Sequence, residues 1–346
     1  MGTVEQPLSE SVRRFAHAQG ADLCGVGTAQ PYSDYRDEIR RRQAETGASH
    51  IDFMIRPWDT GHFERISDPR RSLPTARAVI VLGIYAYDTK SVEPPGTEQP
   101  RGKIARTYVY YPVARRIGEA VAGFLEQRGY KAVHGQDVPL KHVAARLGLG
   151  CYGRNGILLT PQFGSYVAFR SVITDAPLEP TQADTPNVCT NCDRCLKACP
   201  TGALYAPYKV DPKRCVNPLT RRSEPIGPEV RTRLRNWVRG CDICQEVCPA
   251  NRRLKPREPD PRARFEPDHH ETHRGLGGLE RFPALPGLLG ADRPNNLRRH
   301  AAIALANTAR NRKEALAALR AYLSTCDHDL LPYFQWAIDR LTRERL

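Results

Sequence analysis

Residues 189–200 read CTNCDRCLKACP, which places four cysteines in the pattern Cys-x2-Cys-x2-Cys-x3-Cys-Pro. A second run, CDICQEVCP at 241–249, repeats the later part of this pattern, and Cys215 lies 26 residues upstream of it. Eight of the eleven cysteines therefore fall within 60 residues. Thiolates at these intervals can surround a metal centre, so the two runs decide how this part of the chain folds.

The order of the cysteines also predicts which sulfurs act together. In the C-x2-C-x2-C-x3-C-P pattern of bacterial ferredoxins, three cysteines hold one 4Fe–4S cluster and the fourth ligates the other. A tight turn with three thiolates can wrap one cubane, and the x3-Cys-Pro step carries the fourth sulfur to the neighbouring cluster. One predicted ligand set is Cys189, Cys192, Cys195 and Cys248. The other predicted set is Cys199, Cys215, Cys241 and Cys244.

Disulfide bonds and zinc are the two rivals to iron–sulfur clusters for these cysteines. Disulfides need an oxidising compartment and fit C-x2-C spacing poorly. Zinc is the stronger rival, because paired C-x2-C units also form zinc knuckles. Zinc sites do not require the full x2-x2-x3-C-P register, so the spacing favours iron–sulfur clusters. The remaining cysteines, Cys24, Cys151 and Cys326, are predicted to be small core residues.

Length and composition indicate a folded protein of two or three domains. The chain has 346 residues, of which 40% are hydrophobic, enough for a packed core. No apolar run approaches the length of a membrane span, and the residues after Arg13-Arg14-Phe15 are too polar for an export signal. With oxygen-sensitive thiolates in addition, we expect a cytoplasmic protein that does not contact a membrane.

The positive charge predicts a polyanionic partner. The net charge is +14, and residues 213–257 hold 12 Lys or Arg against 4 Asp or Glu. A nucleic-acid surface and a solvated basic face explain this tract equally well. The arginines expected to contact phosphates are Arg231, Arg233, Arg235, Arg239, Arg252 and Arg253.

The apolar patterns predict an α+β chain. Residues 76–85 (ARAVIVLGIY) are predicted to form a buried central strand, residues 113–129 an amphipathic helix, and residues 157–159 and 166–174 paired strands. Residues 229–238 are predicted to form a helix between the cysteine runs, and residues 296–309, 313–324 and 331–343 three further helices.

These elements imply four parts. We expect an α/β domain over 1–180, a ferredoxin-like double-cluster domain over 181–258, a linker over 259–290 and a helical segment over 291–346. The last segment resembles one HEAT-type unit, although a generic helical cap fits the same pattern.

Several stretches, taken together with the cysteine runs, resemble the epoxyqueuosine reductase family. They are DPRRSLPTAR at 68–77, GLGCYGRN at 148–155, LLTP at 158–161, FGSY at 163–166 and LRRHAAIALAN at 297–307. The resemblance implies a cobalamin-dependent enzyme with two 4Fe–4S clusters that reduces the epoxide of epoxyqueuosine in tRNA. It also implies an external electron donor of the flavodoxin or ferredoxin type.

The resemblance places cobalamin against the glycine-rich turn at 148–155. The cofactor-binding residues that it implies are Gly148, Gly150, Cys151, Gly153, Asn155 and Ser165. The glycines would let the backbone approach a large macrocycle closely. An ordinary helix end followed by a turn would also use them. Cys151 stands where the family has tryptophan, and its sulfur could approach cobalt.

The catalytic acid is the main departure from the family. The family usually has an aspartate 14 residues before the glycine-rich turn, and His134 occupies that position here. We expect His134, or Asp137 after a local shift of three residues, to supply the proton. Tyr108, Tyr110 and Tyr111 are the next candidates, although packing is the commoner role of such aromatics.

Because the pocket residues differ from the family pattern, two other functions stay open. One is a reductive-dehalogenase-like reaction on an organohalide. The other is a two-cluster electron carrier or a corrinoid-handling protein. The large N-terminal domain, with its own glycine-rich turn, favours an enzyme, since a pure carrier needs little beyond the cysteine region.

Overall fold

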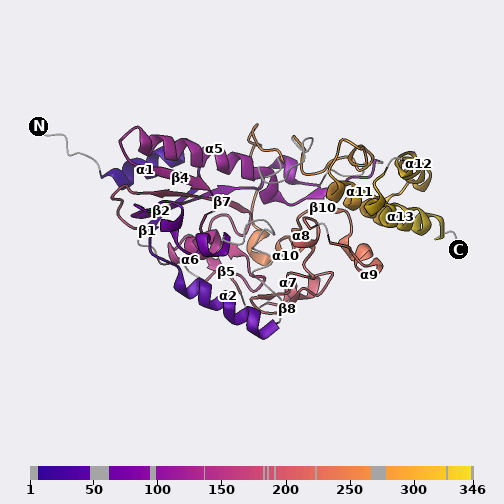
Figure 1. The fold of residues 1–346 in the computed structure, drawn as a ribbon, viewed down its shortest axis with the longest axis horizontal. Helices are drawn as coiled ribbons and strands as arrows, with labels where there is room; N and C mark the ends of the chain where they lie inside the picture. The colour runs from indigo at the N-terminus through magenta and orange to yellow at the C-terminus, as the bar shows by residue number, and fades with distance from the viewer. Residues whose placement is uncertain are drawn as a thin grey trace, which may run out of the picture.

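The computed structural model describes residues 7–46, 62–93, 99–135, 137–181, 184, 187–190, 192–222, 224–265, 278–324 and 326–343. A four-stranded antiparallel sheet forms the centre of the N-terminal half, in the order β1-β2-β7-β4 (Figure 1). Its strands are β1 (Leu23–Thr28), β2 (Ala78–Tyr85), β4 (Ala132–Gly135) and β7 (Val167–Thr174). All residues of β2 are buried between its two neighbours, so the predicted central strand is confirmed.

The sheet separates two apolar cores. Ile80 and Leu82 face the core that it shares with α1 (Leu8–Ala18) and α5 (Arg106–Glu126). Val79 and Val81 face the opposite core, which contains residues of α6 (Leu140–Arg146). Figure 1 shows α1 and α5 on one side of the sheet and α6 on the other. Successive strand residues point to opposite faces, so a strand buried on both sides must be apolar throughout.

Helix α5 begins seven residues before the predicted start at 113, and it includes Pro112. A proline inside a helix removes one hydrogen bond and costs about 3 kcal/mol. Tyr108, Val109 and Tyr110 are all buried in the first two turns. Full burial of a large apolar side chain contributes roughly 1.5–3 kcal/mol, so the packing of these residues offsets the proline.

The predicted pairing of the two strand segments after residue 156 is wrong. Both segments are strands, but β6 (Leu158–Leu159) pairs with β5 (Cys151–Tyr152), and β7 pairs with β2 and β4. Gly156, at a φ of +71°, closes the short β5–β6 hairpin. The glycine-rich turn therefore leads into a hairpin of its own beside the main sheet.

The cysteine runs lie on short helices. The first run contains α7 (Arg194–Ala198), and the second contains α10 (Ile243–Glu246). Between them lie the hairpin of β8 (Leu204–Ala206) and β9 (Lys209–Val210), and α8 (Val216–Leu219). These short elements lie beside the sheet domain (Figure 1).

The predicted helix over 229–238 is also wrong. The segment divides into α9 (Pro228–Arg231), the 3-10 turn η3 (Thr232–Leu234) and β10 (Trp237–Arg239). Arg235 has a φ of +54°, which no α-helix accepts, so the helix ends before it. β10 pairs in parallel with β3 (Lys103–Ile104), a contact across more than 130 residues that local sequence does not reveal.

The three C-terminal helices are confirmed as α11 (Asn295–Thr308), α12 (Arg312–Leu323) and α13 (Leu331–Arg343). Their buried residues, such as Leu305 and Phe334, belong to the same continuous core as α5. The domain limits at 180, 258 and 290 stay a prediction. The other described elements are α2 (Ser33–Thr46), α4 (His62–Ile66), η1 (Pro69–Arg71), η2 (Thr89–Ser91), η4 (Pro249–Asn251), η5 (Pro286–Leu288) and η6 (His328–Leu330).

The mixed α and β architecture agrees with the predicted fold class. Within the described ranges, none of the helices has the length and apolar character needed to cross a membrane.

Candidate metal and cofactor site

Charge effects among the eight predicted cluster ligands connect the two cysteine runs in the way that the two predicted ligand sets require; we call these sets the first and second groups. None of the eleven cysteines forms a disulfide. Burial, together with the charges of Cys189 and Cys192, raises the pKa of the Cys248 thiol. Burial and the charge of Cys199 raise the pKa of Cys215 to about 11. Because such charge effects need neighbouring sulfurs, Cys248 lies with the first run, and Cys199 lies with Cys215.

The remaining ligands show effects within the same two groups, and Cys195 of the first group also acts on Cys244 of the second, so the two groups lie close together. Burial and then Cys248 raise the pKa of Cys195, while burial, Cys244 and Cys215 raise that of Cys241. Among the described residues, no three His, Cys, Asp or Glu side chains are arranged to hold a single metal ion. In a 4Fe–4S cluster each thiolate binds a different iron, so the sulfurs surround the cluster without meeting at one point. The residues fit two such clusters, whose iron would deprotonate the thiols.

The glycine-rich turn contacts a ligand of the first group directly. The backbone N–H of Arg154 donates to Cys189 Sγ at 3.4 Å, and Arg154 Nη2 lies 2.5 Å from Asp193 Oδ1. On its other side, the N–H of Tyr208 donates to the Arg154 carbonyl at 2.7 Å. These contacts fix the turn to the cysteine region, and the Arg154 amide faces the sulfur of Cys189.

Backbone conformation and close packing within the chain explain why glycine occurs at the three predicted positions. Gly148 follows α6 with a φ of +70°, a left-handed conformation that favours glycine. A Cβ at Gly150 would lie 2.5 Å from the Leu159 carbonyl oxygen, and one at Gly153 would lie 2.8 Å from Asn155 Oδ1. Asn155 is buried, and its Oδ1 accepts from the Ile157 N–H at 3.1 Å. Glycine and asparagine here shape the turn that meets the cluster.

Ser165 and Cys151 also join the sheet domain to the cysteine region. Asn251, three residues after Cys248, donates through Nδ2 to Ser165 Oγ at 2.8 Å and accepts from the Ser165 N–H at 2.9 Å. Cys151 Sγ accepts from the Val188 N–H at 3.2 Å. Cys151 belongs to neither apolar core, so the prediction that it is a core residue is wrong. Its strand is held beside the first cysteine run instead.

Two further side chains at this junction have shifted pKa values. Lys141 of α6 is exposed, yet burial lowers its pKa against the opposing effect of Cys244 and Cys215. Tyr152 is 37% exposed, yet burial raises its pKa to about 12. Both side chains therefore lie among many protein atoms and still reach water, at the junction of α6, the glycine-rich turn and the cysteines.

Lys141 was not among the predicted site residues. Its sequence signal is weak, because it is simply the one lysine in a short amphipathic helix. Only the effect of Cys244 and Cys215 on its pKa distinguishes it from other exposed lysines.

The two candidate acids lie on different sides of the sheet. His134 lies on β4 opposite Val172, and a methyl group on Gly118 of α5 would be 3.6 Å from its Cβ. Its Nδ1 is 3.4 Å from Arg170 Nη2, and burial followed by the Arg170 charge lowers its pKa. His134 therefore faces α5, away from the core that contains α6.

Asp137 lies in the loop after β4, at the start of the approach to α6. Its Oδ1 is 3.6 Å from Arg65 Nε, and its side chain is 28% exposed. The next residue, Val138, is buried in the core that also contains Val143 and Leu147. The structure thus brings Asp137, and not His134, to the side of the sheet that carries α6 and the glycine-rich turn.

The three candidate tyrosines belong to the core beneath α5. Tyr110 is fully buried and donates its O–H to Asp88 Oδ2 at 2.6 Å. Tyr108 donates to Asn217 Oδ1 at 2.9 Å, and Tyr111 packs against the same core. They act as packing and hydrogen-bonding residues in the described structure.

Two of the six arginines expected to contact phosphates are buried, which corrects that expectation. Arg231 donates through Nε to the Ile226 carbonyl at 3.0 Å and stacks on Tyr333. Arg239 is 3% exposed and packs over Phe265. In both cases an aromatic ring covers the guanidinium, so the charge lies inside the protein. The four that are exposed are Arg233, Arg235, Arg252 and Arg253.

Comparison with known proteins agrees with this arrangement. Residues 188–251 match the family of 4Fe-4S double cluster binding domains, so this region binds two 4Fe–4S clusters. The epoxyqueuosine reductase of Bacillus subtilis (strain 168) is 29% identical over 245 residues, which cover 67% of this chain and 61% of the relative. The chain thus spans about three fifths of that relative's length.

A second relative is covered more fully. The epoxyqueuosine reductase of Synechococcus sp. (strain CC9605) is 31% identical over 240 residues, 67% of this chain and 73% of the relative. An epoxyqueuosine reductase solved with an epoxyqueuosine-modified tRNA-Tyr stem loop has the same fold, with a TM-score of 0.72 and 24% identity over 96% of this chain and 98% of that one. The chain belongs to the epoxyqueuosine reductase family.

Proposed function

We propose that this protein is a cobalamin-dependent iron–sulfur reductase that reduces the epoxide of epoxyqueuosine in tRNA. The observation that carries the proposal is the 3.4 Å contact between the Arg154 N–H of the glycine-rich turn and Cys189 Sγ. This contact brings a cluster ligand to the junction that also carries Lys141 and Tyr152. Family membership and the relative that was solved with a tRNA stem loop support the substrate.

Each part of the site has a distinct role in this proposal. One cluster is held by Cys189, Cys192, Cys195 and Cys248, and the other by Cys199, Cys215, Cys241 and Cys244. When bound, cobalamin would supply a low-valent metal centre able to reduce an electrophile. Lys141 and Tyr152 line its place, and the backbone at 148–155 borders it. The clusters store electrons, which an external flavodoxin-like or ferredoxin-like donor supplies one at a time.

Asp137 is the proposed proton donor. Opening an epoxide leaves negative charge on oxygen, which a positioned acid must protonate. Asp137 lies on the α6 side of the sheet, in a partly exposed loop beside Arg65. His134 faces α5 on the opposite side of the sheet. This difference in placement supports Asp137 as the donor.

The exposed arginines of the cysteine region provide the proposed RNA contact. Arg252 and Arg253 follow directly on the second cysteine run and are exposed. If they bind backbone phosphates, affinity for tRNA will fall steeply with salt, because each contact releases counterions. Their double reversal to glutamate should weaken binding and reduce that salt slope, whereas reversal of Lys313 on α12 should do neither.

One experiment tests the proposed reaction in stages. Anaerobically prepared protein is titrated with cob(II)alamin, and its absorption spectrum is compared with that of free cofactor. Loaded protein is then reduced and incubated with a tRNA anticodon stem loop that carries epoxyqueuosine, and loss of the epoxide is followed by mass spectrometry. No spectral change on adding cobalamin would leave the electron-carrier function as the better account.

A second substrate class is favoured by one observation. Cys151 stands in the glycine-rich turn where the family has tryptophan, and its Sγ accepts from the Val188 N–H. A smaller residue leaves a wider site, so an electrophile other than epoxyqueuosine, including an organohalide, is the second candidate. Turnover of an organohalide by loaded protein that leaves the stem loop unchanged would establish it.

A further inference from the structure

A hairpin in the cysteine region links two ligands of the same predicted cluster. Cys199 lies five residues before β8, and Cys215 lies five residues after β9. The base of the hairpin is closed by a hydrogen bond from the Asp211 N–H to the Ala203 carbonyl at 2.8 Å. The Cys215 N–H then donates to the Asp211 carbonyl at 3.1 Å. The hairpin is therefore attached at both ends to the second cluster.

The tip of this hairpin presents two tyrosines to solvent. Tyr205 is 48% exposed and Tyr208 is 41% exposed, and they are two of only five large apolar side chains that are exposed in the described residues. Tyr208 has a φ of +63°, an uncommon conformation for tyrosine. Its carbonyl accepts from Arg42 Nη1 at 3.2 Å, and its N–H donates to the Arg154 carbonyl. The tip is thus fixed between α2 and the glycine-rich turn.

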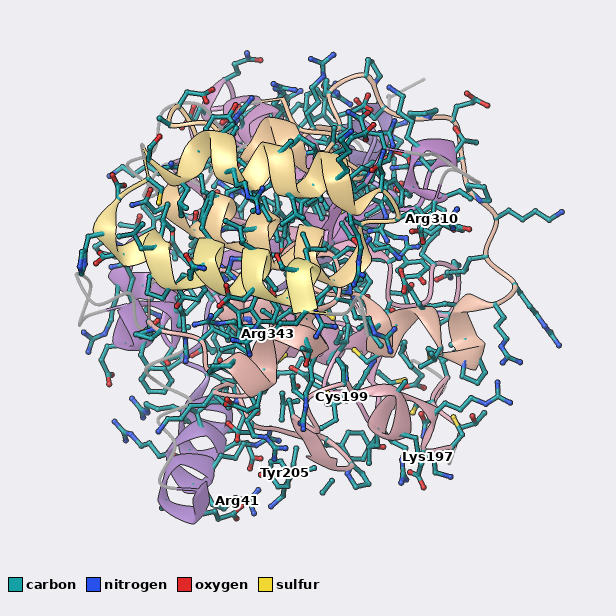
Figure 2. All side chains as sticks on the ribbon, turned by 90° about the vertical axis from the view of Figure 1, so that its right-hand side faces the viewer. Arg41, Lys197, Cys199, Tyr205, Arg310 and Arg343 are labelled. Carbon is teal, nitrogen blue, oxygen red and sulfur yellow. The ribbon has the colours of Figure 1, made fainter. Side chains whose placement is uncertain are left out.

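Positive charge surrounds the hairpin. Residues 197–222 contain six Lys or Arg and one Asp. Lys197, Lys213 and Arg214 are exposed, while Lys209 pairs with Glu45 of α2 at 2.8 Å. Figure 2 shows Lys197, Cys199 and Tyr205 at the same end of the molecule. We call the two tyrosines with Lys197, Lys213 and Arg214 the hairpin surface.

We propose that the hairpin surface is the docking site of an acidic one-electron carrier protein that reduces the second cluster. The inference rests on the proposed function, because a reductase must receive electrons from outside. One electron passes from the reduced carrier to the cluster held by Cys199 and Cys215. The carrier is oxidised by one electron, the cluster is reduced by one, and no bond forms or breaks.

The observations favour a carrier protein over RNA at this surface. Electron transfer requires close approach to a cluster, and this surface is built on the segment between two ligands of one cluster. RNA binding does not require that placement, because RNA takes no electron directly from a cluster. Redox encounters are usually small and transient, and they use exposed apolar groups ringed by complementary charge. Opposite charges would steer the carrier and raise its association rate by roughly 10- to 1,000-fold at low salt.

The test measures cluster reduction without cobalamin or tRNA. The probe is a reduced flavodoxin of net negative charge, mixed anaerobically with protein that holds both clusters, and bleaching of the cluster absorbance is followed by stopped flow. Lys197→Glu with Lys213→Glu should lower the second-order rate constant at low salt by at least about tenfold. The matched control is Lys313→Glu with Arg320→Glu, both exposed on α12, which should leave the rate constant within about twofold of the parent.

Further measurements separate the possible outcomes. Reduction by dithionite should be equal in all variants, which shows that the clusters are intact. Tyr205→Ser, with every charge retained, should also slow reduction by flavodoxin. An equal loss in the control pair would mean that net charge alone acts, and would overturn the proposal. Unchanged reduction together with weaker binding of the tRNA stem loop would assign the surface to RNA. Failure of the epoxide assay does not alter this measurement, because neither tRNA nor cobalamin is present.

Discussion

Asp242 is the residue whose loss should most weaken the cysteine region. It lies between Cys241 and Cys244 and is fully buried. Its Oδ2 accepts from the Arg106 N–H and Arg106 Nη1, both at 3.0 Å, and from Arg281 Nη1 at 2.7 Å. Burial alone would raise its pKa, but Arg281 and Arg106 outweigh burial and hold the pKa of this carboxyl below its usual value.

The perturbation is Asp242→Asn, which keeps the shape and removes the charge. Among the described acidic residues, Glu246 would then be the one carboxylate paired with Arg106 and Arg281. Its Oε1 lies 3.4 and 3.2 Å from them, and its side chain is 33% exposed. Removing one partner from a buried ion pair costs about 3–5 kcal/mol, because the other charge is left buried. The matched control is Asp292→Asn. Asp292 is 73% exposed and 3.5 Å from Arg293, so this change should cost less than about 1 kcal/mol.

Anaerobic denaturant unfolding, followed by cluster absorbance and far-UV circular dichroism, gives the free energy of unfolding for the parent and both variants. Since the folded pKa of Asp242 is lowered, its stabilisation is present above its unfolded pKa of about 3.9. The difference between parent and Asp242→Asn should be constant from pH 5 to 8 and shrink only as pH falls below about 4. Equal destabilisation by the two variants would refute the argument from the buried network.

The other predictions concern the clusters, the acid and one buried histidine. Cys248→Ser should lower iron and sulfide from about eight of each per chain to about four, with the second cluster retained; stoichiometric zinc without sulfide in the parent would contradict the ligand assignment. Asp137→Asn should reduce turnover on the stem loop by about a hundredfold or more and leave cobalamin binding intact, whereas His134→Gln should have little effect; the reverse result would place the acid at 134. Burial, then Arg299, lowers the pKa of His300 to about 3. Because the unfolded chain binds this proton near pH 6.5, His300 makes stability fall by up to about 1.4 kcal/mol per pH unit below that value, and His300→Gln should remove that slope in urea unfolding at pH 5 and 7.

The sequence by itself determined the metal framework and most helices and strands. Ligand spacing is a local property, so the register around Cys189 and Cys241 predicted the double-cluster domain without any knowledge of the fold. The apolar run at 76–85 likewise predicted the central strand, since only a strand buried on both faces is apolar at every position. The crossed grouping of Cys199 and Cys248 also follows the order of the ligands along the chain.

Tertiary structure decided which side chains meet. His134 and Asp137 are three residues apart, yet strand alternation and the loop after β4 send them to opposite sides of the sheet. Arg231 is an interior residue because it packs on Tyr333 of α13. The charge pattern of the sequence does not predict this contact. The pKa of Lys141 responds to Cys244 and Cys215, which lie far from it along the chain. Periodicity and spacing describe neighbours along the chain, whereas the faces of a site are set by contacts between segments far apart in it.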